Sequence, residues 1–193
     1  MRIAVIGAGA IGCLVAGYLK EKGEDVTLVG RGRTVREIKD NGLFISGVRG
    51  NFMLRIGISE SLNYIPDLAI LATKTQDIDS ALQGNAHLLQ NSLFLTTQNG
   101  VQADNLVAKY LDRQKIISSI IMFGATCLEP GKVVHNFEGS WVLGESPVSL
   151  SLVLDKAFPT IITEEIKGMR YLKIFANASN CLPAIIGKSM QEV

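Results

Sequence analysis

Three polar residues near the end of the chain could carry out chemistry on a small polar molecule. Lys173, Asn177 and Asn180 are spaced at i, i+4 and i+7, so they share one face of a helix. Their surroundings are apolar, and a buried ammonium or amide is costly without partners, so we expect this face to line a wet cleft. An ammonium group in such a cleft can stabilise negative charge on an oxygen atom and donate a proton. The alternative is a solvent-exposed face that carries amides by chance.

A glycine-rich turn at the beginning of the chain could bind phosphate groups. An apolar run at residues 3–6 leads directly into the pattern Gly-x-Gly-x-x-Gly, and a helical pattern follows it. The six residues of the turn are Gly7, Ala8, Gly9, Ala10, Ile11 and Gly12. In such a turn the first glycine bends the chain, the second lets the backbone touch a pyrophosphate, and the third lets helix and strand pack closely. Phosphates then bind the free N–H groups of the helix N-terminus. The pattern predicts a dinucleotide site, and the alternative is a tight turn without a ligand.

Two cationic residues follow other expected strands. Arg31 comes just after the strand at residues 26–29, in the region where an NAD-preferring site carries Asp or Glu. A guanidinium group instead suits a 2′-phosphate, so we expect NADP(H) rather than NAD(H). Lys74 follows a buried strand at residues 67–73, at the sheet edge where ligands of open α/β sheets bind. The alternative is that both cations are solvated loop residues.

These residues need a fold that brings separate strand ends together, and the order of elements predicts one. Apolar runs at residues 92–97 and 115–123 predict two further strands, with a helix at 78–89 before them. Residues 43–46 and 52–58 predict an inserted antiparallel hairpin. An unbroken helical pattern runs from residue 163 to about residue 186. We therefore predict an α/β fold, a Rossmann-like doubly wound sheet with an inserted hairpin, over residues 1–162. One long helix follows in residues 163–193.

The composition excludes several classes of partner. The 193 residues include 19 basic and 18 acidic side chains, and a net charge of +1 gives no general attraction to nucleic acid or to an anionic membrane. No stretch reaches the eighteen or so apolar residues of a membrane span. The three cysteines are odd in number, and neither they nor His87 and His135 show metal-ligand spacing. We therefore expect no metal site and a reducing compartment, the cytoplasm.

Six features taken in order identify a family that the chain resembles. They are the glycine turn, the arginine after the second strand, Lys74, the run Gln98-Asn99-Gly100, the pair Pro130-Gly131 followed by His135, and the helix with Lys173, Asn177 and Asn180. Together they resemble the 2-dehydropantoate 2-reductases, also called ketopantoate reductases. The resemblance implies NADPH-dependent reduction of 2-dehydropantoate, or a similar small 2-oxo acid, to pantoate in pantothenate and coenzyme A synthesis. It also allows a homodimer.

The resemblance implies a role for each matching residue. The lysine that matches Lys173 acts as the general acid, and the residues that match Lys74 and Asn99 place cofactor and substrate. The asparagines that match Asn177 and Asn180 bind substrate. Family members continue with a helical domain that closes over the substrate, so we expect residues 163–193 to be the incomplete beginning of that domain. The alternatives are a non-catalytic NADP-binding module and a hydroxy-acid dehydrogenase of related fold.

Overall fold

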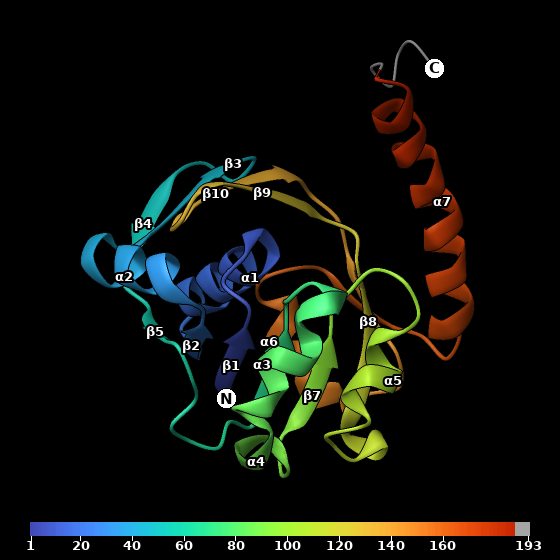
Figure 1. Ribbon diagram of the computed structural model, residues 1–193, viewed down its shortest axis with the longest axis horizontal. Helices are drawn as coiled ribbons and strands as arrows, with labels where there is room; N and C mark the ends of the chain where they lie inside the picture. Colours follow the sequence, from blue (N-terminus) through green and yellow to red (C-terminus); the bar gives the residue numbers. More distant parts are fainter. Residues whose placement is uncertain (188–193) are drawn as a thin grey trace.

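An eight-stranded sheet forms the centre of the protein (Figure 1). The computed structural model describes the backbone of residues 1–187 and the side chains of residues 1–178 and 185–187. In spatial order the strands are β12 (Thr160–Ile162), β11 (Trp141–Leu143), β8 (Ile116–Ile121), β7 (Leu93–Thr96), β6 (Leu68–Leu71), β1 (Arg2–Ile6), β2 (Asp25–Val29) and β5 (Gly57–Ser59). All neighbours are parallel except β8 and β11. The predicted doubly wound sheet is confirmed.

Helices cover both faces of this sheet because its central strands are apolar on both sides. In β1, Ile3 and Val5 belong to one hydrophobic core while Ala4 and Ile6 belong to the other, as the two-residue period of a strand requires. The helices are α1 (Ala10–Glu21), α2 (Gly32–Asn41), α3 (Ile78–Gln83), α4 (Ala86–Leu89), α5 (Ala103–Val107), α6 (Val148–Asp155) and α7 (Ile166–Ile186). Helices α1 and α6 pack in the first core, and α3, α4 and α5 pack in the second. Two short 3₁₀ turns, η1 (Thr75–Asp77) and η2 (Arg113–Lys115), complete the set.

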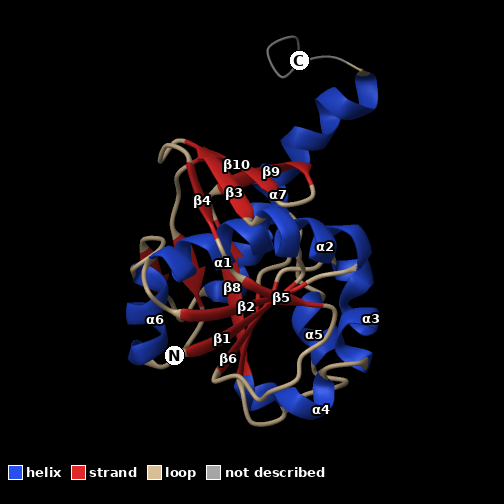
Figure 2. Cartoon of the chain, turned by 90° about the vertical axis from the view of Figure 1, so that its left-hand side faces the viewer, coloured by secondary structure: helices blue, strands red, loops and turns tan. Residues whose placement is uncertain are grey.

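A second sheet arches over α1, as both overall views show (Figures 1 and 2). Its order is β4 (Phe52–Leu54), β3 (Leu43–Gly47), β10 (Lys132–Phe137) and β9 (Gly124–Glu129). The predicted hairpin is present as β3 and β4, which pair antiparallel. It is joined by β10, which pairs parallel with β3. The inserted hairpin is therefore half of a small sheet that closes one core.

Two predicted elements are divided in the structure. Residues 52–58 were expected as one strand, but the chain leaves the hairpin after β4 and joins the main sheet as β5. Arg55 fixes this change of direction, since its Nη1 donates to the carbonyl oxygens of Lys39 and Asp40 at 3.1 and 2.9 Å. The helix expected at 78–89 is interrupted between α3 and α4. There the side chain of Asn85 accepts from the Leu62 amide and donates to the Ala81 carbonyl, both at 2.8 Å.

Helix α7 extends away from the sheets after a first turn that is packed against them (Figure 2). The predicted long helix is confirmed. Arg170 is buried with 5% of its surface exposed, whereas Phe175, little more than one turn later, is 80% exposed. Among the described helices, none combines the length and the apolar character needed to cross a membrane. Helix α7 therefore presents two environments, one at the sheet and one in solvent.

Candidate active site

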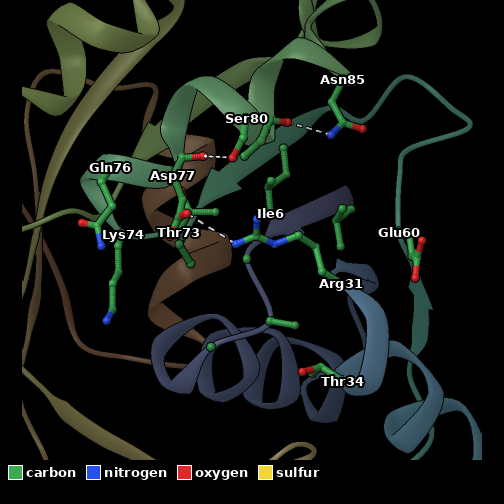
Figure 3. A pocket seen from close by; sticks show the side chains of 17 residues that line it. Ile6, Arg31, Thr34, Glu60, Thr73, Lys74, Gln76, Asp77, Ser80 and Asn85 are labelled. Carbon is green, nitrogen blue, oxygen red and sulfur yellow. Dashed lines mark hydrogen bonds and ion pairs between the residues drawn. The ribbon is translucent and has the colours of Figure 1, made fainter.

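A large cavity lies where the carboxyl ends of β1, β2 and β6 meet. Its volume is about 450 Å³, within the range of small-molecule sites. Residues from the glycine turn, the end of β2 and the loop after β6 line it, and Figure 3 shows their side chains. Ligands of open α/β sheets bind at this position. The cavity therefore lies where the sequence predicts a dinucleotide site.

The three glycines of the turn differ in the space around them. Gly7 has φ +118°, and a β-carbon there would lie 2.6 Å from the amide nitrogen of Thr73. A β-carbon on Gly12 would overlap the carbonyl oxygen of Gly7. A β-carbon on Gly9, in contrast, would meet nothing within 4 Å. The fold thus requires the first and third glycines, while the second leaves bare backbone open to the cavity, which fits the close approach of a pyrophosphate.

The rest of the glycine turn divides between cavity and core. Ala8 lines the cavity together with Gly7 and Gly9. Ala10 and Ile11 form the first turn of α1 with the buried Gly12, and these three do not line it. Gly9 is the N-cap of α1, so the unpaired amides of the helix begin beside the open backbone.

Arg31 extends across the cavity toward the loop after β6 (Figure 3). Its side chain is 76% exposed, and its Nη2 lies 3.4 Å from Oδ1 of Asp77. An exposed ion pair of this kind contributes little, about 0–1 kcal/mol, so the guanidinium can exchange one anionic partner for another. On the other side of the cavity Glu60 accepts a 3.1 Å hydrogen bond from the amide of Gly32. Sequence reasoning missed both carboxylates because neither belongs to a motif.

Lys74 lines the same cavity, and a glutamine that follows strand β7 fixes the loop that carries Lys74. Nε2 of Gln98 donates to the carbonyl oxygens of Leu71 and Thr73 at 3.0 and 2.9 Å. The Lys74 side chain points away from Arg31 (Figure 3). The hydroxyl of Thr73 is buried without a partner among the described atoms, and so is Oε1 of Gln98. Both are polar groups that a ligand could satisfy.

A second, narrow cleft brings Asn99 and Lys173 together. Asn99 follows β7, whereas Lys173 comes from α7 and is partly buried. The Lys173 ammonium donates to the carbonyl oxygen of Ile121, and burial lowers the pKa of this lysine below its ordinary value. Asn177 is also partly buried, one turn further along α7. Asn180 lies in the same helix, but its side chain is outside those that the structure describes.

The predicted site residues are therefore divided between two neighbouring places. The first half of the glycine turn (residues 7–9), Arg31 and Lys74 line the large cavity, Asn99 and Lys173 line the narrow cleft, and Asn177 lines neither of them. The cleft is also lined by Arg170, which sequence reasoning did not single out. The sequence does contain a signal for Arg170, because it is a charged residue among apolar neighbours on the same helix as Lys173. The parallel sheet and its glycine turn together define a Rossmann-like fold.

Comparisons with known proteins identify the family. The family model described as ketopantoate reductase PanE/ApbA matches residues 3–147. A relative from Pyrococcus horikoshii named 2-dehydropantoate 2-reductase is 33% identical over 96% of this chain and 64% of its own length. A PanE/ApbA family ketopantoate reductase structure from Ralstonia eutropha superimposes with a TM-score of 0.87 at 25% identity, over 93% of this chain and 62% of that one. A D-mandelate dehydrogenase structure with NADH gives 0.89 at 26% identity, over 100% and 66%.

The chain belongs to the ketopantoate reductase family. It spans about 64% of the length of the Pyrococcus horikoshii relative. The resemblance found in the sequence motifs is confirmed.

Proposed function

We propose that this chain is the cofactor-binding part of an NADPH-dependent reductase of 2-dehydropantoate or a similar small 2-oxo acid. The observation that carries the proposal is the meeting of Lys173 and Asn99 in one cleft beside the glycine-turn cavity. Because the two residues come from α7 and from the end of β7, only the folded chain brings them together. The family relatives named 2-dehydropantoate 2-reductase support this reaction.

The cofactor proposal rests on the residues of the large cavity. The open backbone at Gly9 and the first amides of α1 would hold the pyrophosphate, and Arg31 would bind the 2′-phosphate of NADP(H). Lys74 supplies a second cation at the same cavity. The nicotinamide, when bound, supplies the hydride.

Lys173 would act as the general acid of the reduction. An ammonium group has three N–H donors, and one of them is directed to the carbonyl oxygen of Ile121. Another can donate to the keto oxygen of the substrate, where negative charge develops as hydride reaches the carbon. Burial lowers the pKa of Lys173, which makes the proton easier to release. We propose Asn99, Asn177 and Asn180 as substrate-binding residues.

The same family membership supports proposals on domain organisation, pathway and location. We propose that residues 1–162 form the NADP-binding unit, that residues 163–193 begin a helical substrate domain, and that the product is pantoate for coenzyme A synthesis. A cytoplasmic location is supported by the free thiols of Cys13 and Cys127. A homodimer remains part of the proposal.

A second candidate is a dehydrogenase of another 2-hydroxy acid. The similarity to D-mandelate dehydrogenase over the whole chain favours it, since that enzyme shares the fold and is shown with NADH. The two candidates differ in substrate size and in the cofactor that Arg31 would select.

The test measures NADPH binding and oxidation by the chain, and by a chimera that adds the part of the Pyrococcus horikoshii relative that this chain does not span. We expect the chain to bind NADPH but to reduce 2-dehydropantoate slowly, because water is not excluded. The chimera should be faster with 2-dehydropantoate than with benzoylformate, the 2-oxo acid of mandelate. The reverse preference would favour the second candidate. A chain that binds neither NADPH nor NADH would contradict both.

A further inference from the structure

A buried arginine on α7 forms a dense set of polar contacts three residues before Lys173. The guanidinium of Arg170 donates from Nη1 to Oδ2 of Asp104 at 2.7 Å. From Nη2 it donates to the hydroxyl of Thr96 at 2.9 Å and to the carbonyl oxygen of Ser119 at 3.3 Å. These partners belong to α5, β7 and β8. One side chain therefore joins α7 to two strands of the main sheet and to helix α5.

The carboxylate of Asp104 is held in its charged form by the same contacts. Burial alone would raise its pKa, but the hydroxyls of Ser118 and Thr96 and the Arg170 guanidinium hold the pKa below its ordinary value. The Thr96 hydroxyl donates to Oδ1 at 2.6 Å, and the Ser118 hydroxyl donates to Oδ2. Hydrogen bonds satisfy both carboxylate oxygens and both terminal nitrogens of the guanidinium, whereas Nε of Arg170 has no partner among the described atoms, and breaking such a pair is strongly unfavourable. The position of Arg170 is therefore fixed from several directions.

The network continues into the strands next to the cleft. The Ser119 hydroxyl donates to the carbonyl oxygen of Thr96 at 2.7 Å and accepts from the indole nitrogen of Trp141 at 2.9 Å. Trp141 is fully buried in β11. Strands β7 and β8 thus carry hydrogen-bond acceptors for Arg170, and Trp141 of β11 supports them through the Ser119 hydroxyl.

Arg170 and Lys173 both anchor α7 to the backbone of β8. Residues three apart on a helix are neighbours on its surface. Arg170 donates to the carbonyl oxygen of Ser119, and Lys173 donates to that of Ile121, two residues further along the strand. Alternate residues of a strand repeat its orientation. Helix α7 therefore contacts β8 through Arg170 and through Lys173. Of these two residues, Arg170 also forms the ion pair with Asp104.

The apolar side chains of this part of α7 give it little support. Tyr171, Leu172 and Phe175 are each more than half exposed. Met169 and Ile174 are only partly covered, with 36% and 40% of their surfaces exposed, so the contacts of Arg170 are the most deeply buried ones in the segment around Lys173.

We propose that Arg170 is a positioning residue for Lys173: its buried pair with Asp104 seats α7 on β8 and so sets the place of the Lys173 ammonium in the cleft. The inference rests on the proposed function of Lys173, but the placement can be measured without any turnover. If Arg170 only stabilised the fold, its loss would lower stability and leave the surroundings of Lys173 unchanged in the folded protein.

The first test measures the pKa of Lys173 in the 193-residue chain by competitive acetylation read by mass spectrometry. In Arg170→Met the helix should separate from β8, the ammonium should regain water, and the pKa of Lys173 should rise toward that of an exposed lysine. Arg170→Lys keeps the positive charge without the planar fork, so it should give a smaller rise. Lys167→Met removes an exposed cation from the same helix and should leave the pKa of Lys173 unchanged.

Variants that fold poorly do not end the test. Asp104→Asn keeps the shape of the side chain but removes the negative charge and replaces one acceptor oxygen with an amide donor, so it should shift the pKa of Lys173 in the same direction as Arg170→Lys. A folded Arg170→Met or Asp104→Asn variant in which the pKa of Lys173 is unchanged would overturn the proposal. NADPH affinity should stay at the parent value, because the cavity is built by the glycine turn.

The second test separates this inference from the proposed function. In the chimera, Arg170→Met should lower kcat by about 10²-fold with little change in the KM for NADPH, as expected when a catalytic group is displaced by about 1 Å. If Lys173→Ala in that chimera keeps its full rate, the proposed function fails while the pKa result stands. If Lys173→Ala is slow but Arg170→Met is not, the positioning role fails alone.

Discussion

The two halves of the candidate site are built by different means. The large cavity is formed by backbone, with the open chain at Gly9 and the exposed side chain of Arg31. The cleft around Lys173 depends on contacts among four elements, α5, α7, β7 and β8, with Arg170 buried and Asp104 partly buried between them. A nucleotide phosphate needs bare backbone and accessible cations, which a short local segment can provide. A proton donor, the role that we propose for Lys173, needs a fixed place, and the neighbouring Arg170 is held by a contact between residues 66 positions apart.

This contrast predicts that changes in the two halves separate binding from chemistry. Changes in the large cavity should act on cofactor affinity and selectivity, and changes around Lys173 should act on the rate. The following tests are ordered by the size of the effect that we expect.

The largest effect is expected from Gly9→Val, which should abolish NADPH binding. A side chain there would stand where the pyrophosphate must touch backbone. Because a β-carbon at Gly9 meets nothing within 4 Å, the variant should keep the parent circular dichroism spectrum. Gly12→Ala is the matched control, since its β-carbon would overlap the Gly7 carbonyl and should disturb the fold itself. Parent NADPH affinity in folded Gly9→Val protein would show that the turn is structural only.

Lys173→Ala should lower the rate of 2-dehydropantoate reduction by about 10²-fold or more in the chimera, because a positioned general acid contributes about 10²–10⁴-fold. NADPH affinity, measured by fluorescence titration, should be unchanged. Lys167→Ala, an exposed lysine on the same helix, should keep the parent rate. A full rate in Lys173→Ala would place the general acid elsewhere.

Arg31→Ala should remove most of the preference for NADPH over NADH. A hydrogen bond to a charged group contributes roughly 1.5–3 kcal/mol, so the parent preference should be about 10- to 100-fold. Arg33→Ala is the control, because Arg33 is exposed but does not line the cavity. The measurement is the dissociation constant of NADPH and of NADH for each variant. Equal values for the two cofactors in the parent protein would refute the role of Arg31.

The smallest effect concerns a residue that lines neither the cavity nor the cleft. His135 is fully buried, with Nδ1 3.0 Å from the Tyr18 hydroxyl, and burial lowers its pKa although Glu138 opposes the shift. The unfolded chain binds a proton near pH 6.5 while the folded chain does not, so stability should fall as pH drops through that value toward the lowered pKa. The slope should be at most about 1.4 kcal/mol per pH unit. Urea unfolding of His135→Gln should lack this component, and identical slopes in both proteins would exclude it.

The sequence predicts the first half of the site more completely than the second. Gly7, Gly9 and Gly12 lie in one short motif, so their places follow from local geometry. The helix spacing of Lys173 and Asn177 also predicts a shared face. The partners of Arg170 do not follow, because Asp104, Thr96 and Ser119 meet it only through the order of strands. For the same reason the pairing of β10 with β3 is absent from the sequence prediction, although each strand has its own apolar pattern.

The arch of the small sheet has a consequence for the order in which the chain folds during synthesis. Strand β3 ends at Gly47 and its parallel partner β10 begins at Lys132, which is 132 − 47 = 85 positions later. At about 5–20 residues per second, ribosomes need roughly 4–17 s to make this stretch. Until then the part of α1 that packs against β10 stays uncovered. A fragment of residues 1–131 should therefore bind an apolar dye that the full chain excludes, and equal dye binding by both would show that α1 is covered before β10 arrives.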